Sequence, residues 1–271
     1  MPLLSTVTVI GAGKLGTTLI KGLIDAGTAL ATNVTVTAGH AARVDELAAG
    51  LGVHGAATNV EAAKRSEMVV LAVKPRQVEA VMQEIGPVMR ADQLLVSVAA
   101  SVHTSAIERH LKAAVPVVRA MPNTPAQIRL GMTALAPGTH ATHEHLARAR
   151  KVFDSVGRTV IVDEKHMDAV TALSASGPAY IYIIIESLAE GGVKVGLPRD
   201  IATQLAAQTV LGAGAMVMQT GEHPALLKDD VTTPAGCTID GILELEEGGL
   251  RVALIKAVVR ATQRASELAD A

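Results

Sequence analysis

Residues 7–162 alternate between short β-branched runs and stretches with helical spacing, and this alternation constrains the fold more than any other feature of the chain. Continuous apolar strands separated by helices are typical of βαβ units, in which helices cover both faces of a parallel sheet. The predicted strands are residues 7–10, 34–37, 68–73, 94–98, 115–119 and 159–162. Helical spacing between the early strands is found at residues 15–26, 44–51 and 78–89. The first half of the chain is therefore predicted to be an α/β domain with a doubly wound sheet.

The strand pattern ends near residue 163, and only helical patterns follow it. The predicted helices are residues 167–173, 179–191, 201–219 and 250–268, separated by Gly-Gly pairs and prolines. This change predicts two domains, residues 1–163 with the sheet and residues 164–271 with helices alone. The mean hydropathy of +0.35 is high for a monomer. We expect some helical surface to be buried against a second subunit, although 24 glycines and many alanines also suit a dense core.

Composition argues against several classes of partner. Binding of nucleic acid needs a basic surface and aromatic side chains for stacking. It is disfavoured here, because the chain has a net charge of −2, two tyrosines, one phenylalanine and no tryptophan. The longest apolar runs, such as residues 179–185, are far too short to span a membrane. A single cysteine, Cys237, excludes an internal disulfide and suits a reducing compartment. With no basic region before its first apolar run, the chain is expected to be cytoplasmic and to have no membrane partner.

The sequence VTVIGAGKLG, residues 7–16, contains glycines in the G-x-G-x-x-G spacing. Gly11, Gly13 and Gly16 follow a predicted strand, and a helix is predicted to open at Lys14 and Leu15. In that context glycine permits the tight turn, the approach of a pyrophosphate and close packing of helix on strand. The alternative is an ordinary βα turn without a ligand. We expect a dinucleotide site that includes Gly11, Gly13, Lys14, Leu15 and Gly16.

The end of the second predicted strand bears on the choice of dinucleotide. NAD-binding domains usually place an Asp or Glu there to bind the ribose hydroxyls, and a carboxylate would repel a 2′-phosphate. This chain has Gly39, His40 and Arg43 instead, and its first acid is Asp45. The pattern favours NADPH, with NADH possible, because Arg43 is alternatively a solvated helix residue.

The sequence LAVKP, residues 71–75, lies at the end of the third predicted strand. Ligands of such sheets bind beyond the carboxyl ends of the strands, so Ala72, Lys74 and Pro75 are expected on the nicotinamide side. A surface role for Lys74 is the alternative.

Three histidines close in sequence raise the question of a metal site. His140, His143 and His145 follow a Pro-Gly pair and are predicted to open a helix. No carboxylate and histidine pattern elsewhere completes a ligand set, so no metal is expected.

The sequence VTTPAGCTIDGIL, residues 231–243, crowds small and polar residues before a helical run. Thr233 suits the N-cap and Pro234 the first helical position. The backbone N–H groups of Ala235, Gly236 and Cys237 would then be free donors at the positive end of a helix, where an anion binds. The alternative is a well-capped structural helix.

Several motifs together resemble the pyrroline-5-carboxylate reductase family. They are IGAGKLG, LAVKP, RAMPNTP, DAVTALSASGPAY, EGGVKVGLP and VTTPAGCTIDGILELEEGGLR, and they extend from the first strand to the last helix. The resemblance implies NAD(P)H-dependent reduction of Δ1-pyrroline-5-carboxylate to L-proline, the last step of proline biosynthesis. It also implies a Rossmann domain followed by a helical dimerisation domain. Active sites would be completed between subunits in a dimer, and the resemblance suggests a decamer as the larger assembly.

The resemblance also implies roles for individual residues. The anion at residues 233–238 would be the substrate carboxylate, and Thr238 would hydrogen-bond the ring nitrogen. Glu164 would stabilise the iminium charge, although an acid favoured by a helix dipole is an equal alternative. Asn59 and the segment containing Ala99 and Ala100 would line the cofactor. This chain departs from the family at Ala235, where glycine is common, and we expect a helical conformation there that accepts alanine.

Two rival functions differ in the chemistry that they need. A β-hydroxyacid dehydrogenase needs a helix-borne lysine within a glycine-rich motif, and Lys194 lies in GGVKVGLP without that motif. A non-catalytic NADP-binding sensor needs no carboxylate site. A reductase of a related cyclic imine differs only in the ring that it accepts.

Overall fold

The computed structural model describes residues 4–269, and its chain divides into two compact units. One unit comprises residues 1–176 and 261–271, and the other comprises residues 177–260. The last helix, α12 (Leu250–Ala269), contributes to both units. The sequence-based boundary between residues 163 and 164 follows where strands end rather than where contacts are fewest, and it stays a prediction.

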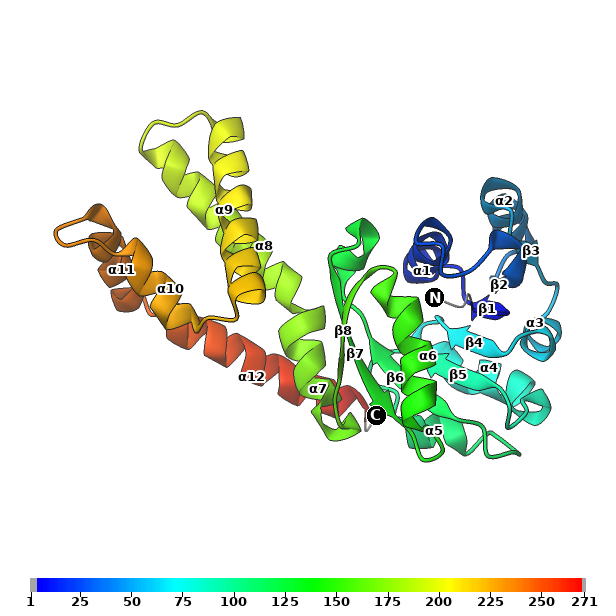
Figure 1. Ribbon diagram of the computed structural model, residues 1–271. Helices are drawn as coiled ribbons and strands as arrows, with labels where there is room; N and C mark the ends of the chain where they lie inside the picture. The colour runs from blue at the N-terminus through cyan, green and yellow to red at the C-terminus, as the bar shows by residue number, and fades with distance from the viewer. Residues whose placement is uncertain (1–3, 270–271) are drawn as a thin grey trace. The chain divides into compact units, whose positions relative to one another are not determined.

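The first unit is built on an eight-stranded sheet in the order β3-β2-β1-β4-β5-β6-β7-β8 (Figure 1). All neighbouring strands are parallel except β6 and β7, which are antiparallel. The strands are β1 (Val7–Ile10), β2 (Val34–Thr37), β3 (His54–Gly55), β4 (Met68–Leu71), β5 (Leu94–Ser97), β6 (Val117–Met121), β7 (Gly131–Pro137) and β8 (Gly157–Ile161). The predicted doubly wound sheet is confirmed.

Helices cover both faces of this sheet, and the strands supply both cores by alternation. Met68 and Val70 of β4 belong to the core under α1, α2 and α6, whereas Val69 and Leu71 belong to the core under α3, α4 and α5. The helices of the first face are α1 (Lys14–Asp25), α2 (Ala41–Leu51) and α6 (His143–Asp154). Those of the second are α3 (Asn59–Arg65), α4 (Pro75–Ile85) and α5 (Thr104–Glu108). Short helical turns complete the unit: η1 (Ala31–Asn33), η2 (Gly86–Val88), η3 (Thr124–Ile128), η4 (Glu164–His166), α7 (Met167–Val170) and the π-turn η5 (Thr171–Ala175).

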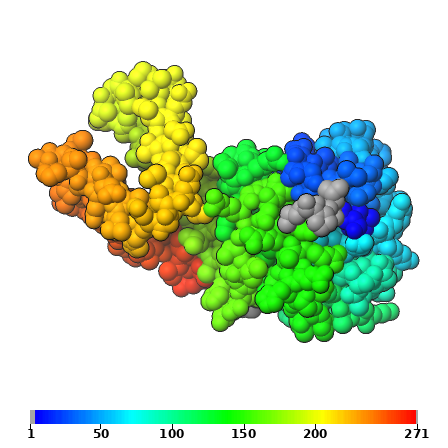
Figure 2. Space-filling model, viewed as in Figure 1, coloured from blue at the N-terminus to red at the C-terminus, as the bar shows by residue number. Residues whose placement is uncertain are grey.

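The second unit consists of helices with little core of their own. It contains α8 (Gly177–Lys194), α9 (Arg199–Thr220), α10 (Pro224–Val231), α11 (Cys237–Glu247) and the first part of α12. Its buried apolar cluster consists of three alanines, Ala189, Ala202 and Ala206. Large apolar side chains are exposed on every one of its helices, among them Leu205, Leu211 and Met216 of α9, whose surface is yellow in Figure 2. Exposed apolar surface of this extent marks an interaction surface.

Two helical stretches of the described chain, residues 164–194 and 199–220, are long and apolar enough to cross a membrane by length and composition alone. The short apolar runs in the sequence did not predict this result. The hydropathy of a whole helix also counts the glycines, alanines and threonines between the runs, and these residues carry no charge. Helices of soluble assemblies pass the same test, so it is weak support for a membrane span.

Candidate active site

The glycine-rich turn between β1 and α1 has the geometry of a phosphate cradle. Gly11 has a φ of +97°, and a Cβ there would lie 2.8 Å from the backbone carbonyl of Ala72. A Cβ on Gly16 would collide with the carbonyl oxygen of Gly11, whereas a Cβ on Gly13 would meet nothing within 4 Å. Gly11 and Gly16 are therefore needed for packing, whereas Gly13 faces open space at the N-terminus of α1. The free N–H groups of the first helical turn, at Lys14 and Leu15, lie at this end.

The end of β2 brings a cation to the same turn. Arg43 of α2 donates from Nη2 to the Thr17 hydroxyl at 3.1 Å and from Nε to the Ala12 carbonyl at 3.5 Å. Its Nη1 lies 2.6 Å from Glu46. The Arg43 side chain therefore lies against the glycine turn instead of extending only into solvent. Gly39 and His40, the residue before α2, are both exposed.

Asn59 is linked to the end of β2 by its side chain. The Thr37 hydroxyl donates to Asn59 Oδ1 at 2.7 Å, and Asn59 Nδ2 donates to Glu84 at 2.8 Å. These bonds hold Asn59 at the carboxyl edge of the sheet, where the family resemblance places the cofactor.

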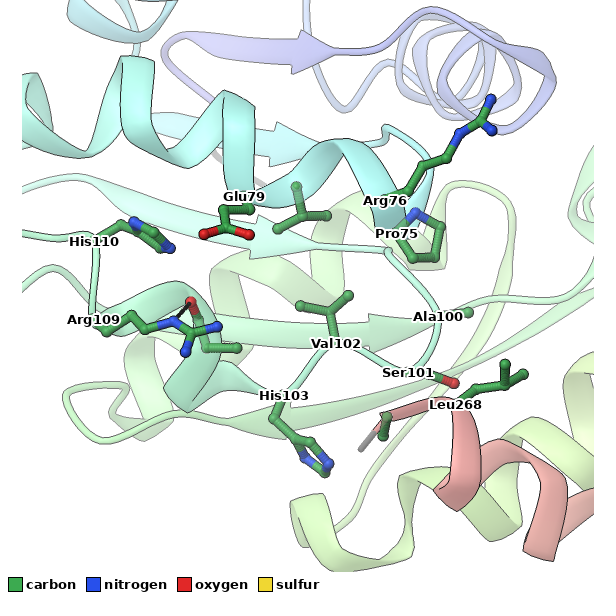
Figure 3. Close-up of a pocket in the computed structure, with 13 residues that line it drawn as sticks. Pro75, Arg76, Glu79, Ala100, Ser101, Val102, His103, Arg109, His110 and Leu268 are labelled. Carbon is green, nitrogen blue, oxygen red and sulfur yellow. Dashed lines mark hydrogen bonds between the residues drawn. The ribbon is translucent and has the colours of Figure 1, made fainter. Parts of the chain in front are cut away.

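The segments after β4 and β5 meet at the same edge of the sheet. Ala72 donates its backbone N–H to the Ile10 carbonyl at 2.7 Å and touches the position of Gly11. Lys74 precedes α4, and Pro75 is the first residue of that helix. Pro75 and Ala100 both line a cavity of about 530 Å³ that extends between α4 and α5, with Val102 near its centre and Leu268 of α12 at its side (Figure 3). Of the expected cofactor residues, Pro75 and Ala100 therefore line one cavity, and Ala72 lies against the glycine turn.

The turn at residues 231–238 differs from the expectation in where the helix begins. Helix α11 begins at Cys237 with Gly236 as its N-cap, so the predictions of Thr233 as N-cap and Pro234 as first helical residue are wrong. Ala235 has a φ of +59°, which also contradicts the expected helical conformation. A side-chain-bearing residue pays roughly 1–2 kcal/mol for this left-handed conformation.

The donors at this turn shift by two residues as a result. The N–H of Gly236 donates to the Thr233 carbonyl at 3.0 Å, so it is not free for an anion as expected. The free amides of the first turn of α11 belong to Cys237, Thr238 and Ile239. Thr233 and Cys237 are exposed and Thr238 is half-buried. The turn still ends in free donors at a helix N-terminus, two residues later than the sequence suggested.

Glu164 accepts two hydrogen bonds from one residue of the sheet unit. Its Oε1 accepts from the Thr104 N–H at 2.7 Å, and its Oε2 accepts from the Thr104 hydroxyl at 2.6 Å. Oε1 also lies 3.5 Å from Nη1 of Arg119, a completely buried side chain on β6. Sequence reasoning singled out Glu164 but missed Thr104 and Arg119. The signal for Arg119 was a lone arginine within the apolar run 115–121.

Comparison with known proteins identifies the family of this chain. The pyrroline-5-carboxylate reductase of Methanosarcina acetivorans is 43% identical over 259 residues, which cover 96% of each chain. The enzyme of the same name from Arabidopsis thaliana is 42% identical and covers 96% of this chain and 94% of its own. The chain belongs to the pyrroline-5-carboxylate reductase family.

Family models assign the two parts of the chain separately. The model for pyrroline-5-carboxylate reductase dimerisation matches residues 164–268. The model described as NADP oxidoreductase, coenzyme F420-dependent, matches residues 6–101. Self-association through the helical part and an NADP-type Rossmann domain are therefore properties of this member of the family.

Solved structures of pyrroline-5-carboxylate reductases have the same fold. The structure from Coxiella burnetii has a TM-score of 0.91 and 37% identity, and the match covers 98% of both chains. The Plasmodium falciparum structure with NADP bound has a TM-score of 0.84 and 27% identity over 97% of this chain and 98% of its own. The glycine turn and its neighbours thus belong to a fold that holds NADP in a relative.

One of the three histidines near residue 140, His145, has a structural role. His145 Nδ1 accepts the backbone N–H of Thr142 at 3.0 Å and so caps the N-terminus of α6. Across residues 4–269, no group of three or more His, Cys, Asp or Glu residues is placed to hold a metal ion.

Proposed function

We propose that this chain reduces Δ1-pyrroline-5-carboxylate to L-proline with NADPH. The observation that carries the proposal is the match to enzymes of that name at 43% identity over 96% of both chains. In this reaction the C=N carbon gains a hydride and the ring nitrogen carries a proton. Because the protonated imine is already electrophilic, the protein has mainly to position the two reactants and favour the iminium charge.

The glycine turn and its neighbours fit the cofactor. Gly11, Gly13, Lys14, Leu15 and Gly16 would hold the pyrophosphate, since a Cβ at Gly13 would occupy otherwise open space. Gly39, His40 and Arg43 would hold the 2′-phosphate, which favours NADPH while leaving NADH possible. Asn59, Ala72, Lys74, Pro75, Ala99 and Ala100 would line the remainder toward the nicotinamide. When bound, the reduced nicotinamide supplies the hydride.

The turn before α11 fits the substrate. The amides of Cys237 and Thr238 would bind the carboxylate, because they are free donors at the positive end of an eleven-residue helix. Thr233 would flank the carboxylate, and Ala235 would keep bulk away from it. The Thr238 hydroxyl would hydrogen-bond the ring nitrogen and orient the C=N bond. Stabilisation of the iminium charge by Glu164 stays a prediction.

The enzyme is proposed to act as a cytoplasmic homodimer, with a decamer as the larger assembly that the family resemblance suggests. The exposed apolar side chains of the helical unit and the match to the dimerisation model support the dimer. A chain whose single cysteine cannot form an internal disulfide suits the reducing cytoplasm, which supports this localisation. No partner beyond a second copy and the small-molecule substrate is proposed.

Oxidation of NADPH by purified protein, followed spectrophotometrically with Δ1-pyrroline-5-carboxylate, tests the proposal. We expect turnover with proline as product, and a comparison of NADH and of the six-membered imine acid would define specificity. Turnover only with a β-hydroxyacid would support the rival dehydrogenase. Binding of NADPH without reduction of any imine would support the sensor.

A further inference from the structure

Arg119 of β6 is a fully buried cation between two carboxylates. Its Nη1 lies 3.5 Å from Glu164 Oε1, and its Nη2 lies 3.8 Å from Asp168 Oδ1. Within residues 4–269, its Nε and Nη2 atoms have no hydrogen-bond partner. Apolar side chains of similar volume often replace a buried ion pair without loss of stability. Stability alone therefore does not account for a charge at this position.

Glu164, one of the two carboxylates that Arg119 faces, caps the start of α5. Both oxygens of Glu164 accept bonds from Thr104, the first residue of α5, and Thr104 is only 4% exposed. His103 is the N-cap of this helix, and its side chain makes no capping bond. Glu164, about 60 residues along the chain, thus supplies the cap that the local sequence lacks.

The segment between β5 and α5 is held at further points. The backbone N–H of Ala99 donates to the Ser97 hydroxyl at 3.3 Å. Ser101 has a φ of +58°, and its hydroxyl donates to the carbonyl of Ala265 in α12 at 3.3 Å. Figure 3 shows Ser101 beside Leu268 of the same helix. A strained conformation of this kind persists where surrounding contacts over-determine it.

The two sets of contacts are connected through the last helix. Ser266 of α12 donates to Asp168 Oδ2 at 2.8 Å, and the other oxygen of Asp168 faces Arg119. Arg119 therefore connects the start of α5, through Glu164, with the helix that binds Ser101, through Asp168. Every residue of this circuit lies in the first compact unit.

We propose that Arg119 and Glu164 are positioning residues that hold residues 99–103 in the conformation that binds the nicotinamide end of NADPH. The inference rests on the proposed function, which places Ala99 and Ala100 at the cofactor. Glu164 then acts on the cofactor segment through Thr104, not on the imine. This assignment differs from the expected role of Glu164 in stabilising the iminium charge, and the two make opposite predictions.

The main test uses Thr104, because removing Glu164 would leave the buried Arg119 with one carboxylate fewer. Thr104→Val removes the hydroxyl bond to Glu164 in a side chain of equal shape, and Thr104→Ser keeps the hydroxyl as the matched control. The Kd for NADPH is measured by fluorescence titration, and kcat and the KM for the imine are measured at saturating NADPH. We expect Thr104→Val to raise the Kd about tenfold, equivalent to ~1.4 kcal/mol. Thr104→Ser should bind NADPH like the parent, and the KM for the imine should stay within about twofold in both.

Glu164→Gln, alone and combined with Thr104→Val, separates the two roles. If Glu164 acts through Thr104, the double variant should bind NADPH little worse than Glu164→Gln alone, because contacting residues are not additive. An unchanged NADPH Kd in Thr104→Val would overturn the inference. So would additive losses in the double variant, or a Glu164→Gln enzyme with lowered kcat and parental NADPH affinity. Failure of the parent enzyme to reduce the imine would instead refute the proposed function.

Discussion

Two alanine substitutions in the glycine turn are predicted to damage different properties of the protein. At Gly11 the φ of +97° is unfavourable for alanine, and the new Cβ would lie 2.8 Å from the Ala72 carbonyl carbon and oxygen. The backbone conformation costs roughly 1–2 kcal/mol. Overpacking against fixed backbone typically adds about 1–3 kcal/mol. Gly11→Ala should therefore lower the free energy of unfolding by about 2–5 kcal/mol.

Gly13→Ala is the matched variant two residues later. Gly13 has a φ of −73°, which alanine adopts freely, and its Cβ would meet nothing within 4 Å. The free energy of unfolding should change by less than about 1 kcal/mol, because the poorer N-cap of α1 and the less flexible unfolded chain act in opposite directions. The added methyl group would, however, project into the space proposed for the pyrophosphate. Gly13→Ala should weaken NADPH binding by at least about tenfold, since displaced backbone contacts to phosphate are charge-assisted.

Urea unfolding followed by circular dichroism, together with fluorescence titration of NADPH, measures both effects. The stability change is reported at equal slopes of the unfolding curves, because a changed slope would signal a different unfolded or native state. Parental stability of Gly11→Ala would refute the packing argument. Parental NADPH affinity of Gly13→Ala would refute the assignment of this turn to the pyrophosphate.

Four further substitutions or treatments test other parts of the molecule. Ala235→Gly relieves the left-handed alanine but frees the unfolded chain, so urea unfolding should show a gain of between zero and about 1 kcal/mol; a clear loss would contradict it. Thr238→Ala should abolish most turnover in the NADPH assay while the Kd for NADPH stays at the parental value, and unchanged turnover would refute its role. Stoichiometric alkylation of Cys237 should inhibit by obstructing the carboxylate site, and full activity of the labelled enzyme would contradict this placement. The hydrogen bond and charge of Arg199 lower the pKa of Glu190, so their contribution to stability is present above the unfolded pKa and is lost as the pH falls through the lower folded value. The Tm of Glu190→Gln should accordingly be slightly below that of the parent at pH 7 and equal to it at strongly acidic pH, and a difference that grows on acidification would refute the linkage.

Strand and helix positions with strong local patterns were predictable from the sequence. The runs at residues 7–10 and 34–37 are β1 and β2 as predicted, because β-branched residues buried on both faces of a parallel sheet leave a continuous apolar signal. Strand β7 was missed. Its sequence GMTALAP contains glycine, alanine and proline, and it is a strand because β6 and β8 pair with it on both sides. Pairing between distant segments overrides weak local propensity.

The candidate site was likewise predictable from the sequence only in part. The glycine spacing, the missing acid after β2 and the small residues at 231–238 are contiguous in the chain, so the cofactor and substrate segments could be proposed directly. The start of α11 was misplaced because a bond from the Gly236 N–H to the Thr233 carbonyl forms a tight turn ahead of the helix. Local cap preferences alone do not distinguish this turn from a helical first turn.

Sequence by itself determined the α/β half followed by a helical half, the strands with strong apolar patterns, the family and the residue types at each ligand segment, because short-range patterning and backbone chemistry are encoded within a few residues. Only the tertiary structure decided that Glu164 caps a helix beginning 60 positions earlier and that Arg119 lies buried between Glu164 and Asp168. Such contacts join β6, η4, α5 and α7, and a lone arginine in an apolar run does not specify its partners. Long-range pairing is decided by the sheet that brings these elements together.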